Sequence, residues 1–317
     1  MMSSTLRPGR SRHPGRLGLL QVALAGVLWG TAGVAVTVLH ERDGIGAMTA
    51  SAWRMAIAAV ALVVFAALSG RLGAVAETMR THPGLAILVG CGTGVYQGLY
   101  FVSVLMVGVG VATVVSLGLA PILASAWEHA RARTTPSPRE VAVVAAALTG
   151  LVLITATAGE GTPAPGGQPA LGLVLALVAG ATYAATTVLG HTVAQRAEPV
   201  ALTTCATTAG AVLLLPFLGL AAATAEPVLP SSPGSLLLLA YLGVATMALS
   251  YGLLYAGLRT TSGSAATVAT LLEPLAAAVL AALLLAERLP WPSLVGGGLI
   301  LAAVLGLQPK PEPPTLA

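Results

Sequence analysis

Charged residues are scarce in this chain of 317 residues, of which only 8% are Asp, Glu, Lys or Arg. A soluble globular domain has about 25% charged residues, so this scarcity excludes an ordinary soluble fold. At the same time, 56% of the residues are hydrophobic and the mean hydropathy is +0.89. The composition therefore indicates an integral membrane protein.

Cysteine and histidine are scarce as well. The two cysteines, Cys91 and Cys205, both fall within apolar segments, and two cysteines make neither a disulfide framework nor a complete metal site. The five histidines form no cluster with metal-ligand spacing. We therefore expect no cofactor and no metal. A membrane-embedded enzyme is the less favoured alternative, because it needs several converging catalytic groups at membrane depth.

Long apolar segments fill most of the chain and are joined by short connections. A segment of about 20 residues crosses a hydrocarbon core of about 30 Å as a helix, since lipid offers no partner for backbone polar groups. The sequence therefore predicts an all-α membrane protein with ten transmembrane helices. A cytoplasmic basic arm (1–16) precedes them, and a disordered Pro-rich tail (309–317) follows. The predicted helices cover residues 17–39, 46–69, 84–106, 109–130, 141–158, 170–191, 200–223, 235–257, 263–285 and 290–308.

The positions of the basic residues predict the orientation of these helices. If the chain starts in the cytoplasm, the cytoplasmic segments hold 12 Lys or Arg residues and the outer loops hold 2; with Arg54 inside the membrane, these account for all 15. By the positive-inside rule, both termini are cytoplasmic. The net charge of +4 then follows from topology and not from a nucleic-acid partner. We expect a multi-pass protein of the plasma or inner membrane, with a small-molecule substrate and the lipid bilayer as partners; a homodimer is left open.

An internal repeat relates the two halves of the chain. Residues 108–121 (GVGVATVVSLGLAP) align with residues 261–274 (TSGSAATVATLLEP) at a constant offset of 153. Both stretches place a proline, Pro121 or Pro274, about halfway along the fourth helix of five, where it is expected to break the helix. Because five is odd, the second copy crosses the membrane in the opposite sense, and inverted repeats place a binding site near the midplane. The predicted repeats cover residues 17–158 and 170–308.

Three stretches carry the features of one transporter family. They are Trp29 with the glycine after it, Arg54 within AWRMAIAA, and the run ATLLEPLAAAVLAALLLAERLPWPSLVGGGLILAAVLG. In that run, Glu287 follows the proline by 13 residues, whereas Thr134 stands at the corresponding place after Pro121. The chain resembles the ten-helix, EamA-type members of the drug/metabolite transporter superfamily. The resemblance implies a secondary transporter for the export or import of small metabolites, amino acids and drugs among them, without ATP hydrolysis. We expect an exporter of amino-acid-like or drug-like compounds that works by alternating access.

Glu273 and Pro274 lie in the middle of the apolar stretch TLLEPLAAAVLAALLLAERL. An ionised carboxylate at the bilayer centre costs about 3 kcal/mol, so we expect Glu273 to face the bundle interior. Pro274 has no N–H and is expected to free the carbonyl of Thr270. The functional interpretation is a substrate or coupling site; the structural alternative is a carboxylate paired with a neighbouring helix and a proline that kinks its own helix.

Arg54 is the one basic residue placed inside a predicted helix. We hypothesise that its guanidinium binds the carboxylate of a zwitterion, while Glu273 binds the amine. The alternatives are an ion pair between Arg54 and Glu273, or an Arg54 side chain that extends outward to the membrane surface. Proton coupling through Glu273 is a further open hypothesis.

Polar-tipped side chains near the midplane complete the candidate site. They suit a mostly apolar pocket with a few orienting hydrogen bonds, although core packing explains each one taken alone. A lipid or isoprenoid carrier, which shares this architecture but needs a laterally open groove, is an alternative function. The candidate lining residues are Trp29, Tyr96, Gln97, Tyr100, Tyr183, Ser250 and Tyr251.

Spaced glycines indicate where helices pack closely. No strand precedes them and no Gly-Lys-Ser/Thr follows, so they are not a phosphate-binding loop. They are Gly26, Gly30 and Gly33, then Gly90, Gly94 and Gly98, and the triple glycine 296–298.

Overall fold

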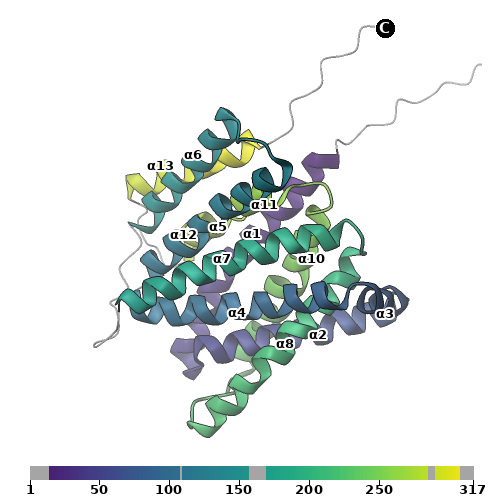
Figure 1. Cartoon of the computed structure of the whole chain (residues 1–317). Helices are drawn as coiled ribbons and strands as arrows, with labels where there is room; N and C mark the ends of the chain where they lie inside the picture. Colours follow the sequence, from purple (N-terminus) through teal and green to yellow (C-terminus); the bar gives the residue numbers. More distant parts are fainter. Residues whose placement is uncertain (1–13, 108, 157–168, 285–289, 308–317) are drawn as a thin grey trace, which may run out of the picture.

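The computed structural model describes residues 14–107, 109–156, 169–284 and 290–307, which form helices and no strand (Figure 1). The all-helical expectation is confirmed for this part of the chain. Glu287 lies outside the described residues. The helices are α1 (Pro14–Asp43), α2 (Ala47–Leu68), α3 (Leu72–Thr81), α4 (Pro83–Val107), α5 (Val109–Ala132), α6 (Pro138–Thr155), α7 (Pro169–Ala194), α8 (Pro199–Ala223), α9 (Pro233–Gly243), the π-helix η1 (Val244–Leu249), α10 (Ser250–Gly257), α11 (Gly263–Ala269), α12 (Leu272–Leu284) and α13 (Trp291–Gly306).

Eight helical segments of the described chain are long and apolar enough to cross a membrane. The helix α13 is apolar but shorter, and α5 is not among the eight. Ten crossings and cytoplasmic termini therefore stay predictions. The eight segments are Arg16–Asp43, Met48–Leu68, Pro83–Ser103, Pro138–Thr155, Pro169–Ala194, Pro199–Ala223, Pro233–Gly257 and Gly263–Leu280.

The structure differs from the predicted set of helices at three places. A short helix, α3, occupies the connection between α2 and α4, where the sequence predicted none. The expected helix 235–257 contains the π-helix η1, in which the backbone is wound more loosely than in an α-helix. The expected helix 263–285 is divided into α11 and α12. Two of the three departures thus interrupt predicted membrane helices.

Glycines allow several helices to approach closely. Gly150 of α6 lies against Gly296 of α13, and a Cβ atom at Gly150 would lie 2.5 Å from the Gly296 carbonyl oxygen. These two helices run side by side at one edge of the bundle (Figure 1). Gly90 of α4 lies against the backbone of Ala206 in α8. The predicted close contacts are confirmed for Gly90 and Gly296. The prediction is wrong for Gly298, where an added Cβ would meet nothing within 4 Å.

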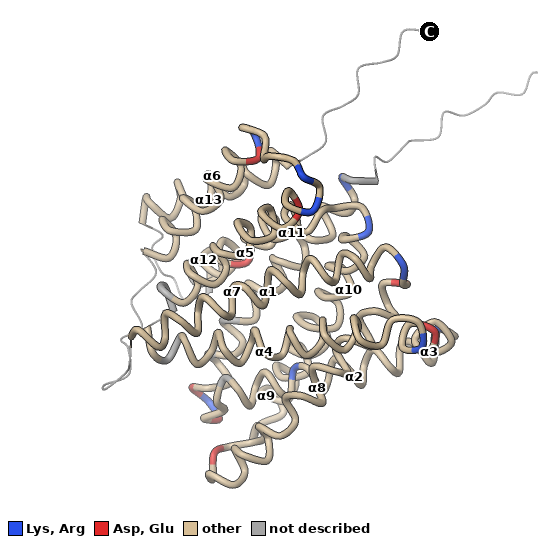
Figure 2. The backbone as a smooth tube through the Cα atoms, viewed as in Figure 1, with Lys and Arg blue, Asp and Glu red and all other residues tan. Residues whose placement is uncertain are grey.

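Charged residues gather at the helix ends and in the connections (Figure 2). Arg71 forms a salt bridge with Glu198 (3.2 Å) between the start of α3 and the start of α8. Ser137 and Glu140 form a capping box that begins α6. Arg54 differs from Arg71, because it lies inside α2, away from both helix ends, and is buried.

Candidate functional site

A turn at Thr270 and Leu271 separates α11 from α12. The N–H of Leu271 donates to the carbonyl of Val268 (3.1 Å), and the N–H of Glu273 donates to the carbonyl of Thr270 (2.9 Å). Both bonds span three residues, as in a 3₁₀ turn, and end the regular α-helical pattern. The expectation that the Thr270 carbonyl is free is therefore wrong, because the Glu273 N–H binds it.

Pro274 lies in the first turn of α12 and not in the middle of a helix. The N–H groups of a first turn have no partner within their own helix, so a proline there removes no hydrogen bond. Pro121 is different: it is buried within α5, which runs from Val109 to Ala132 without interruption. The helix break expected at Pro121 is thus not observed.

Glu273 shares this first turn and is half-buried. The positive end of the helix dipole favours a carboxylate at this place. The helix α1 packs directly against the turn, since a Cβ at Gly30 would lie 2.5 Å from the Glu273 carbonyl oxygen and 2.7 Å from the Cβ of Ala276. Among the described residues, no hydrogen bond or ion pair to the Glu273 side chain is found.

Arg54 is held inside the bundle by the π-helix. Its side chain is buried, with 7% of the residue exposed, so it does not extend outward to the membrane surface. The Arg54 Nη2 donates to Thr246 Oγ1 (3.1 Å) and to Met247 Sδ (3.5 Å), and both acceptors belong to η1. Single π-helical turns within α-helices occur often at functional sites.

Arg54 is buried on α2, and Glu273 is half-buried in the first turn of α12. Within the described part of the chain, however, they form no salt bridge, because no nitrogen–oxygen distance between them is 4.0 Å or less. The alternative in which the two side chains simply pair with each other is therefore not observed. An arginine and a glutamate thus lie within the bundle, on α2 and α12, without a salt bridge between them among the described residues.

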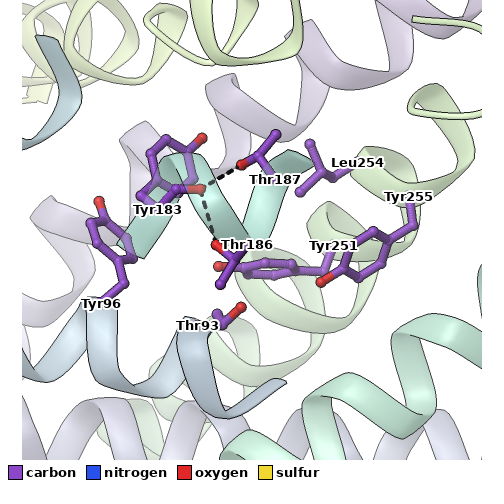
Figure 3. A pocket seen from close by; sticks show the side chains of 8 residues that line it. All are labelled: Thr93, Tyr96, Tyr183, Thr186, Thr187, Tyr251, Leu254 and Tyr255. Atoms are coloured by element: carbon purple, nitrogen blue, oxygen red, sulfur yellow. Dashed lines mark hydrogen bonds between the residues drawn. The ribbon is translucent and has the colours of Figure 1, made fainter. Parts of the chain in front are cut away.

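A pocket lies between α4, α7 and α10 (Figure 3). Seven of its eight lining residues carry a hydroxyl group. Two of these hydroxyls, of Thr186 and Thr187, donate to the carbonyl of Tyr183 at 3.0 and 2.9 Å. The space is narrow, with room for about one water molecule. The lining residues are Thr93, Tyr96, Tyr183, Thr186, Thr187, Tyr251, Leu254 and Tyr255.

Aromatic contacts connect the pocket to neighbouring helices. Tyr96 stacks on Tyr183, with ring centroids 4.9 Å apart and an interplanar angle of 25°. Trp29 of α1 packs against Tyr251, with centroids 5.0 Å apart and a tilt of 56°. Such pairs contribute about 0.5–1.5 kcal/mol beyond the area that they bury. Of the predicted lining residues, the structure therefore brings Tyr96, Tyr183 and Tyr251 into one pocket and places Trp29 beside it.

The other predicted residues differ in their surroundings. The Tyr100 hydroxyl shares a hydrogen bond of 2.8 Å with Thr113 Oγ1. The Ser250 hydroxyl donates to the carbonyl of Thr246 (2.6 Å) and so is engaged by the π-helix. Gln97 is buried, and neither atom of its amide has a partner among the described residues.

Five pocket residues were not predicted from the sequence, namely Thr93, Thr186, Thr187, Leu254 and Tyr255. Each lies three or four residues from a predicted member on the same helix, a spacing that places side chains on one helix face. Extending the predicted tyrosines along their helix faces would have found them.

The described residues contain no group of three or more His, Cys, Asp or Glu side chains that could hold a metal ion. The two cysteines are free thiols. The chemistry of the candidate site within this part of the chain is thus one of hydroxyl groups, aromatic rings, one guanidinium and one carboxylate.

A bundle of apolar helices with a buried cation, an interior carboxylate and a small polar pocket defines a multi-pass membrane protein with a central site. The model of the EamA-like transporter family matches residues 16–156 and, separately, residues 170–307. The chain belongs to the EamA-like transporter family. The resemblance seen in the sequence is thereby confirmed.

Two relatives support this assignment. The chain is 26% identical to the uncharacterized transporter YwfM of Bacillus subtilis (strain 168) over 298 residues, which cover 94% of this chain and 96% of that protein. It is 27% identical to the uncharacterized inner membrane transporter YicL of Salmonella typhimurium (strain LT2) over 294 residues, covering 92% of this chain and 94% of that protein.

A solved crystal structure shares the fold. It matches with a TM-score of 0.74 and 18% sequence identity, over 91% of this chain and 95% of that chain. At this identity the likeness concerns the fold alone.

Proposed function

We propose that the chain is a secondary active transporter that exports small zwitterionic metabolites by alternating access. The observation that carries the proposal is the relationship between Arg54 and Glu273. Arg54 is buried on α2 and Glu273 is half-buried on α12, and among the described residues no salt bridge joins these two groups of opposite charge type. Keeping two opposite charges apart in the interior is costly, and a zwitterion placed between them offsets that cost.

The two charges fit the two ends of such a substrate. The planar guanidinium of Arg54 is suited to a carboxylate, and the Glu273 carboxylate is suited to an ammonium group. The hydroxyl-lined pocket supplies additional hydrogen-bonding groups, and its tyrosine rings supply apolar surface. Its narrowness fits a state in which the substrate path is closed, so that substrate entry requires helix movement.

Alternating access rests on the arrangement of the chain in two halves. The family model matches the chain twice, which supports a duplicated unit, and the predicted five helices per unit make the copies inverted. In transporters of this kind, discontinuous helices bind substrate near the membrane midplane. The interruption between α11 and α12 and the π-helix η1 are two such irregular segments beside Glu273 and Arg54. The proposed topology has ten crossings of the cell membrane and cytoplasmic termini.

The proposed energy source is proton exchange at Glu273. A neutral carboxylic acid without a partner in the interior can release its proton, and the carboxylate so formed can bind an ammonium group, which exchanges one for the other. Proteoliposomes with an imposed pH gradient test this step: uptake should follow the gradient in the wild type and should stay near background at every gradient in Glu273→Gln. Wild-type uptake that ignores the gradient would reject proton coupling.

Export can be tested without knowing the substrate. Cells overproducing the wild type, Arg54→Gln or Glu273→Gln at matched membrane abundance are compared by mass spectrometry of medium and cell contents. Glu77→Gln, on the exposed face of α3, serves as the control. The wild type and the control should release one class of zwitterion, and both site variants should lose at least about 90% of that release. Equal release by all four proteins would reject the site, and redistribution of lipids alone would favour a lipid carrier.

A further inference from the structure

Four buried polar atoms without a hydrogen-bond partner gather on α2 and α4. The described residues contain six such side-chain atoms, and four of them are Ser51 Oγ, Arg54 Nε and both amide atoms of Gln97. Each of these three residues is at most 7% exposed. A buried donor or acceptor without a partner destabilises the fold considerably, so a cluster of them requires an explanation. We refer to Ser51, Arg54 and Gln97 as the polar cluster.

The members of the polar cluster belong to two helices that contact each other, α2 and α4. Met48 of α2 lies beside Gly98 of α4, since a Cβ at Gly98 would lie 3.6 Å from the Met48 Cε. Gln97 is the neighbour of Gly98 in the chain, and Ser51 and Arg54 follow Met48 within two turns of α2. The three side chains therefore start from adjoining stretches of two helices that contact each other.

Two members of the polar cluster lie near residues of the hydroxyl-lined pocket along the chain or through their hydrogen-bond partners. Gln97 lies one helical turn after Thr93, a pocket residue, so the two side chains project from the same face of α4. Arg54 donates to Thr246 and Met247, which precede the pocket residue Tyr251 by five and four residues. Two members of the polar cluster are thus connected to pocket residues, Gln97 along α4 and Arg54 through its partners before Tyr251.

We infer that the polar cluster is a subsite for an amide group of the transported zwitterion. Gln97 presents an N–H donor and a carbonyl acceptor on one planar group, and a second amide presents the complementary acceptor and donor. Arg54 Nε–H and the Ser51 hydroxyl add a cationic donor and a group that both donates and accepts. A carboxylate leaves the Gln97 Oε1 without a donor, and an apolar side chain leaves the whole cluster without partners.

The inference rests on the proposed transport of zwitterions and names their distinguishing group. An N–H beside a C=O occurs in two kinds of small zwitterion, those with a side-chain carboxamide and those with a peptide bond. Both satisfy Gln97 in the same way. They differ in where the amide lies relative to the charged ends, so a ligand series separates them.

The test measures binding of unmodified small molecules to the full-length purified protein by calorimetry. L-Glutamine is compared with L-methionine, which has nearly the same shape without an amide, and with L-glutamate, whose side chain has acceptors only; glycyl-L-alanine represents the peptide-bond arm. The wild type should bind one amide ligand about tenfold or more tightly than both methionine and glutamate. Tighter binding of glutamine indicates a substrate with a side-chain carboxamide, and tighter binding of glycyl-alanine indicates a peptide substrate.

The variant Gln97→Met keeps the volume of the side chain and removes its amide. It should reduce the amide preference to about one while leaving methionine binding intact, which also reports that the variant is folded. Gln21→Met, at a half-buried glutamine of α1, is the matched control and should keep the preference. If Gln97→Met does not fold, the wild-type ligand series decides alone.

The outcomes distinguish this inference from the proposed function. If the wild type binds methionine, glutamate and both amide ligands equally, and Arg54→Gln abolishes all binding, the amide subsite is rejected and zwitterion transport stands. An amide preference that survives in Gln97→Met also rejects the subsite. If the wild type binds none of these ligands, the zwitterion proposal and the subsite fail together.

Discussion

The hydroxyl of Tyr183 donates a hydrogen bond of 2.8 Å to the hydroxyl of Thr270 at the interruption between α11 and α12. Thr270 in turn donates to the carbonyl of Thr267 (3.0 Å). Tyr183 also lines the pocket and stacks on Tyr96. One tyrosine of α7 thus connects the pocket to the turn that positions Glu273.

Tyr183→Phe and Thr270→Val should each destabilise the protein by about 0.5–1.5 kcal/mol, because each removes one side of a buried hydrogen bond. The double variant should cost clearly less than the sum of the two, since both remove the same interaction. The free energies of unfolding of the wild type and the three variants, measured by chemical denaturation in detergent, are compared. Additive effects would mean that the two hydroxyls contribute independently.

Thr246→Val should destabilise the protein by about 1–3 kcal/mol, because it removes the hydroxyl that accepts from the Arg54 guanidinium. A buried charge that loses a hydrogen-bond partner is more costly than a neutral group that does. The matched control is Thr204→Val, a buried threonine whose hydroxyl donates only to the Val200 carbonyl of its own helix (2.7 Å). Equal loss of stability in the two variants would contradict a special role for Thr246.

Gly296→Ala should destabilise the contact between α6 and α13 by about 1–3 kcal/mol through overpacking. A Cβ at this position would lie 2.6 Å from the carbonyl oxygen of Gly150, and backbone cannot move aside as a flexible side chain can. Gly298→Ala is two residues away, in open space, and should leave stability unchanged or raise it slightly through helix propensity. The melting temperatures of the two purified variants check this prediction, and a lower value for Gly298→Ala would refute it.

Glu128→Ala should lower stability by about 0.5–2 kcal/mol. The Glu128 carboxylate, on the last turns of α5, accepts the N–H of Ser264 (3.0 Å) and the Ser264 hydroxyl at the start of α11. It therefore acts as a cap supplied by another helix. Glu128→Gln retains one carbonyl acceptor and should lose less; a melting temperature for Glu128→Ala equal to that of the wild type would show that the cap does not stabilise the fold.

Pro274 illustrates how far local sequence reasoning reaches. Its position in an apolar stretch correctly indicates an irregular helix near Glu273. The sequence does not reveal that the break precedes the proline, at Thr270 and Leu271. Pro121 has the same neighbourhood in the alignment, yet α5 continues through it. A proline is compatible with either a kinked or a divided helix, and the packing of neighbouring helices decides between them.

The lining residues show the same limit. The tyrosines 96, 183 and 251 could be selected from sequence because polar-tipped rings at membrane depth are few, and the structure brings them into one pocket. Threonines are frequent in these helices, and most of their hydroxyls bind a carbonyl of their own helix, as that of Thr204 does. Thr93, Thr186 and Thr187 therefore differ from the other threonines only in lying three or four residues from Tyr96 or Tyr183 on the same helix.

The sequence by itself determined the class of protein and its helical fold. Few charges and long apolar segments require lipid, and lipid requires that backbone polar groups bond within each helix. It also determined the family, whose features extend along almost the whole chain. Only the tertiary structure decided that Arg54 binds Thr246 and Met247 of the π-helix, and that it forms no salt bridge with Glu273 within the described residues. These relationships join helices far apart in the chain, and their distances depend on how the helices pack, which no local pattern encodes.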